Sequence, residues 1–243
     1  MSQSTTSSPP LTVVLVHGAF ADSSSWSGVI ERLQAKGVPV VAAANPLRGI
    51  AIDSAYVAKL IQQIPGRVLL VGHSYGGAVI SNAAADAANV AGLVFVAAFA
   101  PDEGERLGES TAESKDSVLG SAQVPRQYPQ NGTTATEFTL DPAKAHDAFA
   151  ADLPQAQAAL IGVIQRPVSE LAFSEPSGAP AWKRLPSWAV VATQDRAAGT
   201  DVVRAHAARA GAQITEVDGS HLIMLSKPDI VTDVIEEALA KVS

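Results

Sequence analysis

The chain has 243 residues, of which 47% are hydrophobic and 17% charged, with a formal net charge of -7 at pH 7. This length suits one globular domain of strands and helices with an inserted lid. The acidic balance, without any Lys/Arg cluster, argues against a nucleic-acid or anionic-membrane surface. The absence of cysteine excludes disulfides, thiolate metal ligands and a thiolate nucleophile.

Residues 1–10 are rich in Ser and Thr and end in two prolines, without the basic start and apolar run of a signal peptide. We therefore expect a disordered tail on a cytoplasmic protein. The apolar runs elsewhere have the length of strands, far short of the ~20 residues that a membrane helix needs.

In the first part of the chain, short apolar runs alternate with helical patterns. Strands are predicted over residues 12–16, 38–44, 68–72 and 93–98, with helices between them. The apolar runs are continuous rather than alternating, which indicates strands that are covered on both faces. This pattern is typical of a parallel sheet between two layers of helices.

After Pro101 the alternation stops. Residues 102–137 are polar and show no strand period. Two short helices are expected next, one opening at Asp141-Pro142 and one at Pro154, because proline is tolerated at the first helical position. The segment therefore reads as an insertion made of helices.

The alternation returns with strands over 188–192 and 213–217, a helix around 201–210 and a last helix that includes Val231. The predicted fold class is α/β, with a mostly parallel six-stranded sheet flanked by helices and a small helical lid inserted after the fourth strand. The predicted units are a core of residues 11–100 and 187–243, a lid of residues 101–186 and a tail of residues 1–10.

The strongest local signal is the motif Gly72–Gly76 (GHSYG), between a predicted strand and a predicted helix. A serine on such a tight turn is strained and presents its hydroxyl, and its neighbours must be tiny because the strand and helix backbones nearly touch. The helix N-terminus adds partial positive charge where an oxyanion would form. Ser74 is therefore the predicted nucleophile; the alternative is an ordinary glycine turn that contains a serine.

Serine needs a base to accept its proton, and five histidines compete for this role. His17 and His73 flank the glycine turns, whereas His146 and His206 lie in predicted helices, where a solvated histidine is the default. His221 follows the last strand, and loops after parallel strands open on one edge of the sheet. His221 is thus the predicted base, with a loop-capping histidine as the alternative.

The acid that orients this histidine is predicted to be Asp195, which follows the strand WAVVA. The chain order Ser74, Asp195, His221 is the nucleophile-acid-base order of hydrolases with this sheet. Asp102 also follows a strand and is a rival, whereas Asp218 is only three residues from the histidine and is expected to shape its loop.

Two backbone N–H groups are expected to bind the oxyanion. One belongs to Tyr75, directly after the nucleophile. The other belongs to Ala19 in the loop after the first strand, where Gly18 lets the chain pass close by. No metal and no cofactor is implied.

Together these motifs resemble a known family, the small α/β-hydrolases that include plant methyl-ester esterases, hydroxynitrile lyases and bacterial homologues. The resemblance covers the predicted core and implies the same triad and oxyanion residues. The matching segments are His17–Trp26, Val71–Gly77, Ala192–Arg196 and Gly219–Asp229.

Three positions depart from parts of this family. The plant hydroxynitrile lyases have a threonine where this chain has Gly18 and a lysine where it has Leu222. A cationic lysine beside the base helps to manage cyanide charge, which leucine cannot do. At both positions this chain resembles the esterases of the family. The plant esterases, however, carry a histidine where this chain has Ala21, so their substrates cannot be assigned to this chain.

The lid segment carries apolar side chains without a sheet of its own, so they are expected to pack onto the sheet edge above the nucleophile. They are Phe138, Phe149, Leu160, Ile161, Ile164, Phe173 and Trp182. The predicted function is therefore hydrolysis of a small, uncharged, hydrophobic carboxylic ester through an acyl-enzyme. The alternatives are a lyase that cleaves C–C bonds with the same triad and a non-catalytic ligand-binding homologue. The expected partner is a small-molecule substrate, with no nucleic acid and no membrane; a homodimer stays open.

Overall fold

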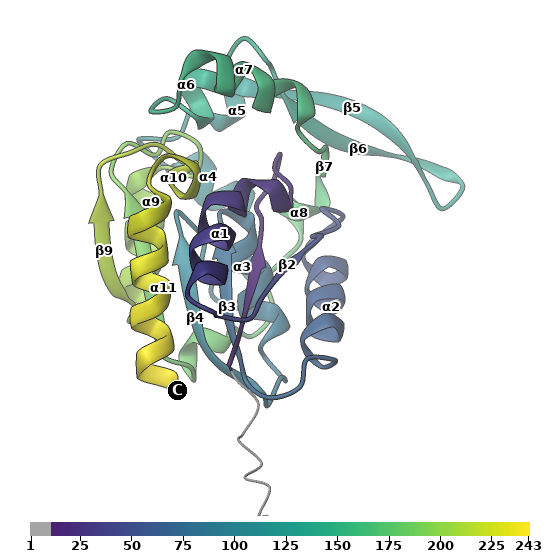
Figure 1. The fold of residues 1–243 in the computed structure, drawn as a ribbon. Helices are drawn as coiled ribbons and strands as arrows, with labels where there is room; N and C mark the ends of the chain where they lie inside the picture. Colours follow the sequence, from purple (N-terminus) through teal and green to yellow (C-terminus); the bar gives the residue numbers. More distant parts are fainter. Residues whose placement is uncertain (1–10) are drawn as a thin grey trace, which may run out of the picture.

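The computed structural model describes residues 11–243, so the tail predicted for residues 1–10 lies outside the described residues. Six parallel strands form the central sheet in the order β2-β1-β3-β4-β8-β9 (Figure 1). The predicted parallel sheet is confirmed. The inner strands β1, β3, β4 and β8 are buried along their whole length, as their continuous apolar runs indicated. The strand bounds are β1 (Thr12–Val16), β2 (Val40–Ala43), β3 (Val68–His73), β4 (Val90–Val96), β8 (Ser187–Ala192) and β9 (Gln213–Val217).

Helices cover both faces of this sheet. Crossovers between parallel strands are right-handed, so the reversal of direction at β1 puts the helix after β1 on one face and those after β2, β3 and β8 on the other. The C-terminal helix packs beside the first one, and α2 packs beside α3. None of the helices within residues 11–243 is long and apolar enough to cross a bilayer. The helices that flank the central sheet are α1 (Ser27–Ala35), α2 (Ile50–Ile61), α3 (Tyr75–Ala83), α9 (Thr200–Arg209) and α11 (Pro228–Val242).

The same reversal places the loops after β1 and β3 side by side, because these two strands are neighbours in the sheet. A sheet of this kind opens a crevice at the carboxyl ends of its strands where the direction of winding changes. The segment between β4 and β8 lies over this edge (Figure 1).

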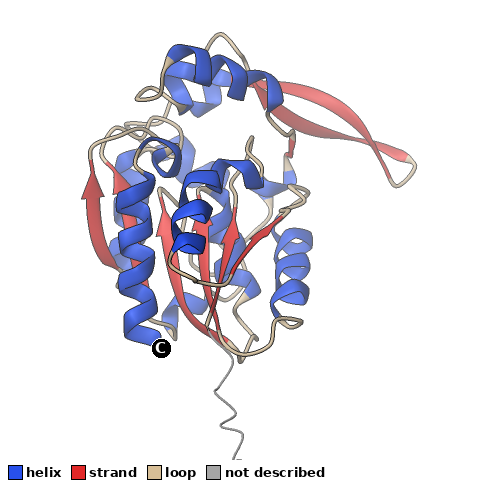
Figure 2. Cartoon of the chain, viewed as in Figure 1, coloured by secondary structure: helices blue, strands red, loops and turns tan. Residues whose placement is uncertain are grey.

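That segment is not purely helical. It contains a three-stranded antiparallel sheet in the order β5-β6-β7, and the β5–β6 hairpin extends away from the core (Figure 2). The last part of the polar stretch that showed no strand period, from residue 123 onward, is therefore a hairpin. The elements of this lid are α4 (Leu107–Glu113), α5 (Leu119–Ala122), β5 (Gln123–Gln130), β6 (Thr133–Leu140), α6 (Ala145–Phe149), α7 (Gln155–Ile164), β7 (Val168–Ser169), α8 (Leu171–Ser174) and a 3-10 turn (Ala181–Lys183).

The hairpin escaped prediction because most of its side chains are at least partly exposed, so neither strand alternates between apolar and polar residues. A local signal was nevertheless present. Asn131 and Gly132 join the strands with φ angles of 50° and 80°. An Asn-Gly pair is the preferred sequence for a two-residue turn with two positive φ angles.

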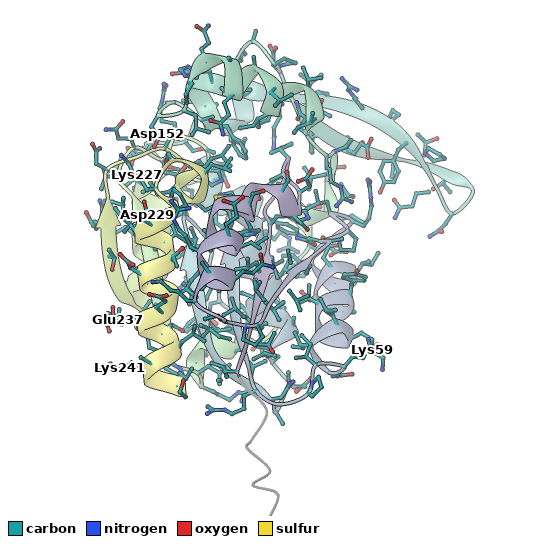
Figure 3. All side chains as sticks on the ribbon, in the orientation of Figure 1. Lys59, Asp152, Lys227, Asp229, Glu237 and Lys241 are labelled. Atoms are coloured by element: carbon teal, nitrogen blue, oxygen red, sulfur yellow. The ribbon has the colours of Figure 1, made fainter. Side chains whose placement is uncertain are left out.

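Polar contacts anchor the lid to the core. Arg48, just before α2, donates from Nη1 to Glu137 Oε2 at 2.8 Å and lies 4.7 Å from the ring centre of Tyr128 in the hairpin. On the opposite side, the Ser220 hydroxyl donates to Asp152, which Figure 3 labels between the lid helices and α11. These contacts tie the lid to the loops on both sides of the sheet edge.

His206 in α9 corrects one expectation, because it is buried and not solvated: its exposed fraction is 7%. Its Nδ1 accepts a hydrogen bond from the backbone N–H of Ala100 at 3.1 Å. Burial, reinforced by the positive charge of Arg209, lowers the pKa of His206 to about 4. The ring is therefore neutral in the folded protein at neutral pH.

This burial predicts a loss of stability in mild acid. The unfolded chain binds a proton at His206 near pH 6.5, whereas the folded chain does so only near pH 4. The contribution of this neutral ring to the free energy of unfolding is fully present above pH 6.5 and is lost as the pH falls toward 4. Between pH 7.5 and 5 the free energy of unfolding should fall by about 2 kcal/mol. Urea unfolding at both pH values should show that His206→Gln, which can still accept from Ala100, loses this part of the pH dependence. An unchanged pH dependence in the variant would contradict the assignment.

Candidate active site

The turn between β3 and α3 holds Ser74 in a strained conformation, with φ 53° and ψ -124°. Only a crowded crossing of backbones sustains such a conformation in a residue with a side chain. A Cβ added at Gly72 would lie 2.5 Å from the carbonyl oxygen of Gly76, and one at Gly76 would lie 2.4 Å from that of Val16. The two glycines are therefore required by close approach, as the sequence motif predicted.

His221 lies in the loop after β9 and is hydrogen-bonded to the predicted acid. Its Nδ1–H donates to Asp195 Oδ2 at 2.7 Å, and both side chains are almost fully buried. The other oxygen of Asp195 accepts from the backbone N–H groups of Ala197 at 2.9 Å and Ala198 at 3.0 Å. With Nδ1 donating, Nε2 carries the lone pair, and it has no hydrogen-bond partner among the described residues. Nε2 is thus the nitrogen available to accept a proton.

The two rival acids are engaged elsewhere. Asp102 pairs with Lys183, and this hydrogen bond lowers the pKa of Asp102. Asp218 accepts a hydrogen bond from Gln194 Nε2 at 2.6 Å and shapes the loop, as expected. Of the three candidate aspartates, the structure places Asp195 against the histidine.

Two further residues contact His221: His73, for which the sequence predicted no such contact, and Phe149, one of the lid side chains expected at this edge. His73 Nε2–H donates to the carbonyl oxygen of His221 at 3.0 Å, and burial lowers the pKa of His73 well below its usual range, so it stays neutral. The ring of Phe149 packs 4.9 Å from that of His221. His73 adjoins the nucleophile, but its contact with a residue 148 positions away has no signal in the sequence.

The loop after β1 passes directly against Ser74. A Cβ added at Gly18 would lie 2.6 Å from the Cβ of Ser74, so a threonine could not replace this glycine without displacing the loop. Within residues 11–243, the backbone N–H groups of Ala19 and Tyr75 have no hydrogen-bond acceptor. The amide of Tyr75 follows Ser74 in the chain, and that of Ala19 belongs to the loop that contacts Ser74. Neither N–H has an acceptor among the described residues, so both could bind an oxygen.

His17 stabilises this loop through two hydrogen bonds. Its Nδ1–H donates to the carbonyl oxygen of Gly18 at 3.0 Å, and its own carbonyl oxygen accepts from Asn45 Nδ2 at 3.0 Å. Burial lowers the pKa of His17 to about 4, so the ring is neutral at physiological pH. His17 therefore supports the backbone of the loop and does not compete as a base.

Two cavities involve the lid: the smaller lies between the lid and the core, and the larger is lined by residues of the lid itself. One of about 300 Å³ includes Phe20, Phe149 and Leu222, the residue after His221. The other, of about 590 Å³, includes Phe138 and Phe173. The ring of Phe20 packs 6.1 Å from Phe149 and 6.5 Å from Phe173, so an aromatic cluster lies between the two cavities. Among the residues that line these cavities, none is lysine or arginine.

The apolar lid side chains do not all pack inward as expected. Phe149 is buried, but Leu160 and Ile164 on α7 are 58% and 51% exposed. Both still line the smaller cavity, so one side of each faces the cavity and the other faces solvent. Trp182 is buried and donates to the carbonyl oxygen of Pro101 at 3.1 Å, which joins the end of the lid to its first residue.

A parallel sheet with a serine on the turn after its third strand and a hydrogen-bonded histidine–aspartate pair on loops at its carboxyl edge is typical of α/β hydrolases. The chain belongs to the alpha/beta hydrolase family, whose sequence pattern matches residues 13–234. The predicted family is thereby confirmed. No curated protein sequence matches the chain.

Solved structures share this fold over nearly the whole chain. Polyneuridine aldehyde esterase is 18% identical with a TM-score of 0.80, covering 94% of this chain and 99% of its own. A pyrethroid hydrolase from Sphingobium faniae JZ-2 is 19% identical with a TM-score of 0.76, covering 96% and 98%. Tomato methylketone synthase I, solved with 2-tridecanone, is 18% identical with a TM-score of 0.77, covering 97% and 100%. At these identities the likeness concerns the fold, which hosts more than one reaction.

Proposed function

We propose that the protein is a serine esterase that cleaves a small, uncharged, hydrophobic carboxylic ester through an acyl-enzyme on Ser74. One observation carries the proposal: His221 is held by Asp195 at 2.7 Å and keeps its Nε2 free, at the sheet edge where a serine occupies a strained turn. A serine hydroxyl becomes an effective nucleophile when such an oriented base accepts its proton.

In the proposed reaction, Ser74 Oγ bonds to the carbonyl carbon of the ester while its proton passes to His221 Nε2. The carbonyl electron pair moves to the oxygen, which the N–H groups of Ala19 and Tyr75 stabilise. The intermediate then expels the alcohol, which takes the proton from His221. Water attacks the acyl-enzyme in the same way and releases the acid, while Asp195 stabilises the transient imidazolium.

Support for an uncharged substrate comes from the smaller cavity, which adjoins the candidate site through Phe20, the residue after Ala19, and Leu222, the residue after His221. Lining residues of the smaller cavity include the apolar side chains of Phe20, Phe149 and Leu222, and the larger one has Glu170 at its wall. An anionic substrate would find no cationic side chain among these lining residues, and burying an unpaired charge is costly. Apolar acyl and alcohol groups gain free energy by leaving water there.

A C–C cleaving lyase on the same triad is the alternative. Leu222, directly after His221, is 1% exposed and brings no positive charge to the base. Cyanohydrin cleavage would gain from a cation at this position to hold cyanide. This residue therefore favours the esterase over a hydroxynitrile lyase.

A panel of p-nitrophenyl esters of increasing acyl length, given to the wild type and to Ser74→Ala, tests the proposal. We expect turnover by the wild type and loss of turnover in the variant. A folded wild type that cleaves none of these esters would contradict the esterase and favour the lyase or a ligand-binding homologue.

The substrate class yields a separate prediction. We expect kcat/KM for neutral esters to exceed that for isosteric carboxylate-bearing esters by at least about 10-fold, because an unpaired buried charge costs more than 1 kcal/mol. The two series should be compared at matched size and leaving group, in low and high salt. A clear preference for the carboxylate series would refute the uncharged-substrate assignment while leaving the esterase chemistry intact.

A further inference from the structure

We propose that Asp53 is a positioning residue that sets the oxyanion-binding amide of Tyr75 by holding the Tyr75 hydroxyl. The inference rests on the proposed esterase function. Tyr75 Oη donates to Asp53 Oδ2 at 2.8 Å, and both side chains are fully buried. The phenol and the backbone N–H belong to the same residue, so the hydrogen bond from the phenol to Asp53 also restricts the position of the backbone N–H.

Asp53 is itself fixed from several directions. It lies in the first turn of α2, and both of its carboxyl oxygens accept from the backbone N–H of Arg48, at 3.0 and 3.1 Å. Burial raises the pKa of Asp53, while these hydrogen bonds and the one from Tyr75 act in the opposite direction. The carboxyl group thus presents one oriented acceptor to α3 from a neighbouring helix.

The turn after the nucleophile needs such an anchor because its other residues cannot supply one. Gly76 and Gly77 follow Tyr75, and neither position can accept a side chain, because a Cβ there would lie 2.4 Å from a backbone carbonyl oxygen. Tyr75 therefore carries the one side chain between the strained Ser74 and Ala78 that can hold the start of α3 in place. A strained turn persists only when its surroundings over-determine it.

Packing of α2 against α3 does not account for the pair. A phenylalanine at position 75 would fill the same space without a buried carboxyl partner, and burying a carboxyl group is costly. The same two helices are also joined by the Ser54 hydroxyl, which donates to the carbonyl oxygen of Val79 at 3.3 Å. Ser54 thus offers a matched control: it is part of the same helix contact but has no link to Tyr75.

The experiment compares Tyr75→Phe and Asp53→Asn with Ser54→Ala. For each variant, kcat and KM are measured on a neutral ester. The affinity is measured for two probes. One is an alkyl boronic acid, which forms a tetrahedral adduct with serine, and the other is the ether analogue of the ester, which has no carbonyl. Removing an oxyanion donor costs about 10²-fold or more, so a misplaced donor should lower kcat and boronate affinity by about 10-fold. KM and ether affinity should change less than about 2-fold, because neither involves the oxyanion.

We expect Ser54→Ala to keep its kcat and boronate affinity, and the Tyr75→Phe/Asp53→Asn double variant to be no worse than either single one. Unchanged boronate affinity in the folded single variants, or losses shared equally by Ser54→Ala, would overturn the inference. If Tyr75→Phe does not fold, the inference is tested with Asp53→Asn and with the NMR shift of the Tyr75 amide proton when the wild type binds the boronic acid. A Tyr75 amide proton that does not shift would contradict the inference. A wild type that binds boronate but cleaves no ester would refute the proposed function alone.

Discussion

Ser74→Ala and His221→Ala are each expected to lower the esterase kcat by at least ~10³, and the double variant should be little worse than either single one. The serine cannot attack without the base, and the base has no proton to accept without the serine. Their losses therefore do not add. The measurement is steady-state kcat and kcat/KM on the best p-nitrophenyl ester, with the melting temperature recorded for each variant.

Matched controls separate this effect from general damage. Ser81 lies in α3, is fully buried and has no hydrogen-bond partner for its hydroxyl among the described residues, so Ser81→Ala deletes the same group seven positions away. His146 in the lid, whose Nε2–H donates to the carbonyl oxygen of Leu153, serves in the same way for the base. Both controls should stay within a few-fold of the wild type. Multiplicative losses in the Ser74/His221 double variant would show that one of the two residues lies outside the mechanism.

Asp195→Asn is expected to lower kcat by about 10⁴ with little change in KM, the loss that a wrong histidine tautomer causes in serine hydrolases. The structure explains why the wrong tautomer should form here. Asp195 Oδ1 accepts from two backbone N–H groups, of Ala197 and Ala198, so the oxygen of an asparagine would be retained there. Its NH₂ group would then face His221 Nδ1 and donate to it. The proton would move to Nε2, which could no longer accept one from Ser74.

The control for this prediction is Asp102→Asn. Asp102 also follows a central strand, but it pairs with Lys183 at the surface, so we expect its variant to keep near-normal kcat. The pH profile adds a second measurement, because a base with an altered tautomer should recover activity only as hydroxide concentration rises. An inactive Asp102→Asn beside a nearly normal Asp195→Asn would reassign the acid.

Much of the fold could be predicted because its signals are local. Strands that are buried on both faces must be apolar throughout, so Thr12–Val16 is bounded as predicted. The edge strand Gln213–Val217 also has the predicted bounds, although most of its residues are exposed, and the other core strands agree to within a few residues. The turn at Ser74 has a local sequence signal, and Gly72 is required by its close approach to Gly76. Gly76 and Gly77 are instead required by close approach to Val16 and Phe99 in other segments of the chain. The β5–β6 hairpin could not be found from burial, because most of its side chains stay at least partly exposed.

Chain order favoured Asp195 among the candidate acids, but only the tertiary structure shows which of them meets the histidine. Asp102 and Asp195 both follow strands, and only the packing of the loops places Asp195 Oδ2 at 2.7 Å from His221 and Asp102 beside Lys183. His206 lies in a helix where a solvated histidine is the default, yet it is buried, and Asp53 is buried in α2 against Tyr75. The sequence by itself determines which residue types follow each strand, because strand and turn geometry depend on near neighbours. Which of those side chains meet depends on contacts between segments far apart in the chain, and these exist only once the sheet has assembled.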